Sequence, residues 1–153
     1  MAQLGSLKET YRPGCFRNGL GGDLRVLWNH ADTQMYVLGR TSANPPTAHF
    51  WEAEDGLRAS ADAPKTQWAD DLLVSMRRGD VTEASLAFWI LESEIENRAD
   101  GKYRIITRAV VHDASVESFG AYTEATSTAD STDQNAEHDN RRTWFEIAKR
   151  RVI

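Results

Sequence analysis

Residues 81–111 read VTEASLAFWILESEIENRADGKYRIITRAVV, and this stretch decides the fold class. Two extended segments occur in it, Val81 to Glu94 and Lys102 to Val111, and both have the composition of strands. The residues Asn97 to Gly101 lie between them and are of types that favour turns. We therefore expect two long strands joined across this turn, in a protein whose body is mainly β.

Shorter strands are expected on both sides of this pair. Alternating apolar residues and turn signals predict strands at Leu24 to His30, Met35 to Arg40, Ala48 to Glu54, Leu57 to Ala63 and Val116 to Tyr122. Asn44-Pro45-Pro46 and the hairpin signal Asp55-Gly56 supply turns between them. The glycine-rich opening, Met1 to Gly22, reads as a loose approach segment with at most a short strand near Tyr11 to Phe16.

One segment has the period of a helix instead. Trp68, Leu72 and Met76 recur at every fourth position and form one apolar stripe. Thr66 is suited to cap the start of this helix, and Gly79 is suited to end it. The fold class expected from the sequence is therefore mainly β (α+β).

The end of the chain differs in composition from the body. Residues 123–140 (TEATSTADSTDQNAEHDN) carry almost no large apolar side chain, which predicts a flexible polar tail. Residues 141–153 then predict a short amphipathic C-terminal helix over Trp144 to Val152, which Thr143 introduces as a capping residue. Residues 1–122 are expected to form one β domain.

Composition excludes several classes of function. The chain has 153 residues, about one domain, and carries 18 basic against 23 acidic residues, the opposite of the basic surface that nucleic acid requires. The longest apolar run, Leu86 to Leu91, is far too short to cross a bilayer, so we expect no membrane partner. The lone Cys15 fits a reducing, cytosolic-type compartment.

Metal and cofactor chemistry also find little support. His30, His49, His112 and His138 share no ligand spacing, and no acidic cluster accompanies them. The glycines at 19, 21 and 22 lack the lysine and hydroxyl of a phosphate-binding loop. We expect neither a metal site nor a cofactor.

Nucleophilic chemistry needs a hydroxyl beside a base that a third group orients. Ser85 carries a hydroxyl near the start of the most apolar predicted strand, and His30 is the last residue of the segment LRVLWNH. Asp113 follows an apolar strand and is suited to orient His30, with His112 or His49 as alternatives. These residues lie far apart along the chain, and an ordinary structural role for each stays open from the sequence alone.

These three positions, in this order, resemble the tailed-phage prohead proteases. The histidine motif of that family is similar to Trp28-Asn29-His30 followed by Leu38-Gly39-Arg40. Its hairpin resembles Asp55-Gly56-Leu57, and its nucleophile motif resembles Ser85-Leu86-Ala87-Phe88. Its last motif resembles Asp113-Ala114-Ser115-Val116, with aspartate where the family has glutamate. The resemblance spans about Tyr11 to Tyr122.

The resemblance implies a fold, a site and a biological role. The fold would be a β-barrel flanked by a few helices, similar to herpesvirus assemblin. The catalytic residues would be Ser85, His30 and Asp113, without metal or cofactor. The protein would be a serine endopeptidase that cleaves the scaffold or capsid protein during prohead maturation, with self-cleavage in the polar tail. It would act as a homodimer in the host cytoplasm, inside the assembling prohead.

Two other functions remain compatible with the sequence. The first is a catalytically inactive capsid-assembly or scaffolding module with the same fold. The second is a hydrolase of small esters that uses the same serine and histidine. Arg40 and Arg108 are candidates to stabilise an oxyanion. Replacing Ser85 with alanine distinguishes an enzyme from an inactive module, because only an enzyme loses an activity.

Overall fold

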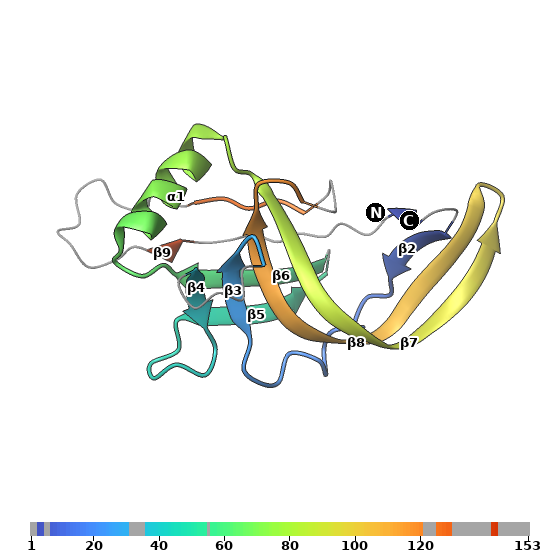
Figure 1. Ribbon diagram of the computed structural model, residues 1–153. Coiled ribbons are helices and arrows are strands. Elements are labelled where there is room, and N and C mark those ends of the chain that lie inside the picture. The colour runs from blue at the N-terminus through green and yellow to red at the C-terminus, as the bar shows by residue number, and fades with distance from the viewer. Residues whose placement is uncertain are drawn as a thin grey trace.

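The computed structural model describes residues 3–4, 7–30, 36–54, 56–120, 125–129 and 142–143. In this part of the chain the strands form a six-stranded sheet and a three-stranded sheet, accompanied by one α-helix (Figure 1). The strands are β1 Gln3–Leu4, β2 Leu7–Tyr11, β3 Arg25–Trp28, β4 Val37–Arg40, β5 Ala48–Ala53, β6 Gly56–Asp62, β7 Glu83–Arg98, β8 Gly101–Glu117 and β9 Arg142–Thr143. The expectation of a mainly β protein is confirmed.

The β7–β8 hairpin is the longest feature of the fold and curves away from the rest of the molecule (Figure 1). Its strands are antiparallel, and Arg98 pairs with Gly101 across the two-residue turn Ala99-Asp100. Gly101 has a φ of 142°, a conformation that glycine adopts without a steric penalty. The predicted pair of long strands is therefore confirmed.

The sequence predicted that this strand ends at Val111, but β8 continues to Glu117. The polar pair His112-Asp113 interrupts the apolar pattern and hides this continuation. Beyond it Ala114 and Val116 are fully buried. The prediction of a separate short strand from Val116 to Tyr122 is therefore wrong at its start, because Val116 belongs to the end of β8. Tyr122 lies outside the described residues.

The opening segment is not loose. Strand β2 runs parallel to β8, with Leu7 opposite Lys102 and Tyr11 opposite Ile106. Beyond β2 the chain turns into the core, where Phe16 is 2% exposed and packs edge-to-face against Tyr11. The expectation for Met1 to Gly22 fails over these residues because their partner strand is almost a hundred residues away in sequence.

The short predicted strands are largely confirmed as β3, β4, β5 and β6. Strands β5 and β6 form the expected hairpin, in which Ala53 pairs with Gly56. Gly56 has a φ of 152°, and Asp55, the first residue of the predicted turn, lies outside the described residues. Gly39 of β4 approaches this hairpin so closely that an added Cβ would lie 2.4 Å from the Thr47 carbonyl oxygen.

The predicted helix is confirmed as α1, Gln67–Arg78. Its buried face consists of Ala69, Leu72, Leu73 and Met76. Gly79 ends it in the left-handed conformation, with φ 81°, and its N–H donates to the Met76 carbonyl. Thr66 occupies the N-cap position in an extended conformation, but its side chain makes no capping hydrogen bond.

The expected closed barrel is not seen, since neither sheet closes on itself in the described part of the chain. The larger sheet has the order β1-β2-β8-β3-β4 with β7 on the other edge of β8, and the smaller has the order β5-β6-β9. The outer strands β1, β4 and β7 do not pair with one another in this part of the chain, so the larger sheet stays open; β8 pairs with β2 along one half and with β3 along the other.

Two parts of the expected C-terminal region are described. Within 123–140, Ala125 and Ser127 are buried beside the start of β7, where Ala84 donates its N–H to the Ala125 carbonyl. Within 141–153, Arg142–Thr143 pair with β6 as strand β9. The predicted helix over Trp144 to Val152 lies outside the described residues.

Candidate active site

The candidate site lies on one face of the larger sheet, where three strands run side by side. Ser115 of β8 is directly opposite Ser85 of β7 on one side and opposite Leu27 of β3 on the other. Because side chains alternate along a strand, Asp113, Ser115 and Glu117 share one face. The other face carries fully buried residues such as Ala114 and Val116. The polar face is thus rigidly supported by the core.

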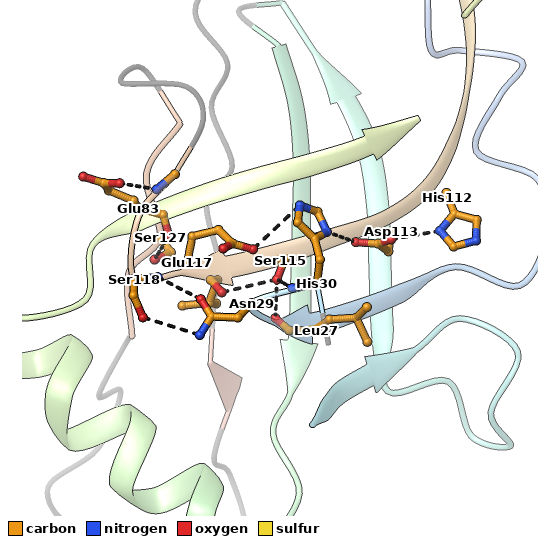
Figure 2. A network of polar contacts seen from close by, with 12 residues as sticks. Leu27, Asn29, His30, Glu83, His112, Asp113, Ser115, Glu117, Ser118 and Ser127 are labelled. Carbon is orange, nitrogen blue, oxygen red and sulfur yellow. Dashed lines mark hydrogen bonds and ion pairs between the residues drawn. The ribbon is translucent and has the colours of Figure 1, made fainter. Parts of the chain in front are cut away.

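His30 reaches this face through an unusual turn after β3. Asn29 and His30 have φ values of 55° and 46°, in the left-handed region that few non-glycine residues adopt. The His30 N–H donates to the Ser115 hydroxyl at 2.7 Å, and the Asn29 side-chain oxygen accepts the N–H of Ser118 at 3.0 Å. These contacts hold the turn so that the imidazole lies over β8 (Figure 2).

The closest side-chain contact of His30 is with Asp113. Its Nδ1 lies 2.6 Å from Oδ1 of Asp113, a carboxylate that is 5% exposed. This hydrogen bond raises the pKa of His30 above its usual 6.5, against the opposing effect of burial. Burial alone would raise the pKa of Asp113, but hydrogen bonds from His30 and His112 outweigh it and lower this pKa below 3.8. Asp113 is therefore ionised near neutral pH and accepts a hydrogen bond from the Nδ1–H of His30.

Glu117 faces the other nitrogen of the same ring. Its Oε1 lies 3.7 Å from Nε2 of His30, is buried, and has no hydrogen-bond partner among the described residues. The negative charge of Glu117 adds to the rise in the His30 pKa because it favours the imidazolium. The ring is thus bracketed by two carboxylates and spans the space above Ser115 (Figure 2).

Ser85 lies on β7, the strand next to β8. Residues directly opposite each other in antiparallel strands have Cβ atoms about 4.5–5.5 Å apart and point to the same face. Ser85 therefore shares the face of Ser115, over which the His30 ring lies. Ser85 is 7% exposed, and its hydroxyl makes no hydrogen bond to any residue that the structure describes. The structure brings His30 and Asp113 into contact and places Ser85 on the same face of the sheet, without a hydrogen bond from its hydroxyl to a described residue.

The remaining candidates lie elsewhere or are already paired. His49 is exposed on β5, in the smaller sheet. The guanidinium of Arg40 forms two hydrogen bonds of 2.7 Å with Asp23, and Arg108 pairs with Glu92 at 2.6 Å. Neither arginine is therefore included in the site.

Sequence reasoning gave no role to Glu117 or to the hydroxyl of Ser115. The signal that could have found them is the period of two along β8, which puts 113, 115 and 117 on one face. The expected break after Val111 concealed it.

The described residues offer neither a metal-binding cluster nor a membrane-spanning helix. Among residues 3–4, 7–30, 36–54, 56–120, 125–129 and 142–143, no group of three or more histidine, cysteine or acidic side chains is arranged to hold a metal ion. In the same part of the chain, no helix has the length and apolar character that crossing a membrane requires.

Comparison with known proteins identifies the family of the chain. Residues 1–140 match the family model described as caudovirus prohead serine protease, which covers most of the 153 residues. No curated protein and no solved structure gives a significant match. The resemblance noted from the motifs around His30, Ser85 and Asp113 is thereby confirmed at the level of the family. The chain belongs to the caudovirus prohead serine protease family.

Proposed function

We propose that this protein is a serine endopeptidase in which Ser85 is the nucleophile, His30 the general base and Asp113 the residue that orients His30. The observation that carries the proposal is the 2.6 Å contact between Nδ1 of His30 and the buried Asp113 carboxylate, on the same face as Ser85. Because Nδ1 of His30 keeps its proton and donates it in a hydrogen bond to Asp113, Nε2 of the neutral ring is the atom that accepts a proton. Family membership supports the same reaction class.

The reaction follows from these positions. Nε2 of His30 takes the proton from the Ser85 hydroxyl as Oγ attacks the peptide carbonyl carbon. The imidazolium then gives that proton to the leaving amine as the C–N bond breaks, which leaves an acyl-enzyme on Ser85. Water attacks the ester with His30 again as the base, and Ser85 regains its proton. Asp113 and Glu117 stabilise the imidazolium in both steps.

The Ser85–His30 hydrogen bond is the contact that the reaction adds to the structure. Hydrogen bonds between catalytic groups are often long without substrate and tighten in the complex. The backbone of Ser85 is fixed by pairing with Ser115, and we expect rotation about its Cα–Cβ bond to turn the hydroxyl toward His30. Substrate binding, which excludes water from this face, is expected to favour that rotamer.

The substrate is proposed from the family. The protein would cleave the scaffold or capsid protein inside the assembling prohead, in the host cytoplasm, and would also cleave its own tail within residues 123–140. It would act as a homodimer and without a cofactor.

Co-expression with the major capsid protein and scaffold of the same phage tests this proposal. Ser85→Ala should abolish the truncation of those proteins seen by mass spectrometry, with little change in melting temperature. Ser93→Ala is the matched control, because Ser93 is an exposed serine of the same strand, β7. Truncation that persists with Ser85→Ala would refute the proposal.

An inactive assembly module of the same fold is the second candidate. The observation that favours it is that the Ser85 hydroxyl makes no hydrogen bond to any of the residues that the structure describes. Such a module would leave capsid protein uncut even with the wild-type chain, and Ser85→Ala would not alter assembly.

A further inference from the structure

His112 occupies an irregular position in β8, immediately before Asp113. In the β7–β8 ladder Ala87 pairs with Asp113 and the next residue, Phe88, pairs with Val111. His112 therefore has no partner in this register and is the extra residue of a β-bulge. Consecutive residues of a regular strand point to opposite faces, so that a regular β8 would carry His112 away from Asp113. The bulge is what allows the two side chains to meet.

The contact that results uses the second oxygen of the Asp113 carboxylate. Nδ1 of His112 lies 2.8 Å from Oδ2, while Nδ1 of His30 lies 2.6 Å from Oδ1 (Figure 2). An ionised carboxylate only accepts hydrogen bonds, and both imidazoles therefore present an N–H to it. Each oxygen of Asp113 has one imidazole partner, and the carboxylate plane is fixed from both sides.

A third side chain holds His112 in this orientation. The Trp89 ring packs edge-to-face against the His112 ring, with centroids 5.0 Å apart. Trp89 is 61% exposed, which is unusual for so large an apolar side chain. The His112 side chain is itself 56% exposed, so that neither ring is needed to fill the core.

We infer that His112 is a positioning residue for catalysis: it fixes the rotation of the Asp113 carboxylate and thereby holds His30 in the orientation that accepts the Ser85 proton. Without His112, the carboxylate is free to rotate about its Cβ–Cγ bond, and one face of it is open to water. His112 contacts Asp113 and not His30, so that it acts through Asp113 and does not replace it as the third catalytic member. This inference rests on the proposed function for its catalytic consequence.

Three substitutions at position 112 distinguish the effect of the hydrogen bond to Asp113 from the effect of the imidazole ring itself. In His112→Asn the amide nitrogen lies near the place of Nδ1 and keeps the donor, whereas in His112→Gln it lies near the place of Nε2. His112→Ala removes the donor altogether. His49→Ala is the control for loss of an imidazole, because His49 is exposed in the other sheet.

The measurement is the rate at which a fluorophosphonate labels Ser85 across pH 5–9, together with the NMR titration of His30. We expect His112→Ala and His112→Gln to label roughly three- to tenfold more slowly, the effect of one net hydrogen bond. In both variants the downfield signal of the His30 Nδ1 proton should broaden and the titration midpoint of His30 should fall. His112→Asn should restore most of the rate and the signal.

Two results would overturn the inference. One is a His112→Ala variant with the wild-type rate and the wild-type His30 titration. The other is a His112→Asn variant as impaired as alanine, since the effect would then come from the ring and not from its N–H. If the wild-type protein is not labelled at all, the proposed function fails, and the NMR titration alone still decides whether His112 positions His30 through Asp113.

Discussion

Replacing Asp113 with asparagine removes one negative charge from the site and keeps the shape of the side chain. The amide offers one acceptor oxygen and one N–H₂ donor to two imidazoles that both donate to the carboxylate now. One ring must therefore change its tautomer or lose its partner. If His30 moves its proton to Nε2, it can no longer accept the proton of Ser85.

The size of the effect follows from the lost hydrogen bond. A hydrogen bond to a charged group contributes about 1.5–3 kcal/mol, which corresponds to roughly 10- to 150-fold in rate. Loss of the charge also removes the largest cause that raises the His30 pKa, so that this pKa should fall toward or below 6.5. The rate of fluorophosphonate labelling and the NMR titration of His30 measure the two effects separately.

Asp80→Asn is the control for this experiment, because Asp80 is an exposed carboxylate that pairs with Arg78 just beyond α1. It should change neither the labelling rate nor the His30 titration. The reasoning is refuted if Asp113→Asn labels within twofold of the wild-type rate, or if the His30 pKa stays where it is in the folded wild-type protein.

Two further predictions concern stability. Gly39→Ala should destabilise the fold by about 1–3 kcal/mol, roughly 2–12 °C in melting temperature, because the new Cβ would lie 2.4 Å from the Thr47 carbonyl oxygen. The control is Gly21→Ala, whose Cβ meets no atom within 4 Å and should have little effect. Equal melting temperatures for the two variants would contradict this packing. The His30–Asp113 pair should stabilise the fold most between about pH 4 and 6.5. The raised pKa of His30 contributes stability that is complete below pH 6.5 and is lost as the pH rises through the raised pKa. The lowered pKa of Asp113 contributes stability that is complete above pH 3.8 and is lost as the pH falls through the lowered pKa. The difference in melting temperature between wild type and Asp113→Asn, followed from pH 3 to 9, should peak in this window, and a difference independent of pH would exclude the pair as its source.

The sequence predicted best those elements whose signals are local. The helix α1 was placed between Thr66 and Gly79 because its apolar stripe and its C-terminal glycine are contained within fourteen positions. The β5–β6 hairpin was likewise found from its turn residues. By contrast, β2 pairs in parallel with β8, and a parallel partner almost a hundred residues away leaves no local signal.

The sequence predicted which residues make up the candidate site but not how their side chains contact one another. Residue types and the family resemblance pointed to His30, Ser85 and Asp113. The structure adds the hydrogen bond between the His30 ring and the Asp113 carboxylate. The bulge at His112 could not be read from the sequence, since it breaks the alternation that identifies a strand face. Glu117 was missed for a different reason, because the strand was expected to end at Val111.

The central claim is that Ser85 is the one hydroxyl that His30 activates. The most direct test is to treat the folded protein with a fluorophosphonate and to map the adduct by mass spectrometry. The account predicts a single phosphonylated site at Ser85, absent from Ser85→Ala and from His30→Gln and retained in Ser93→Ala. An adduct on another serine, or a folded wild-type protein that remains unlabelled from pH 5 to 9, would contradict it.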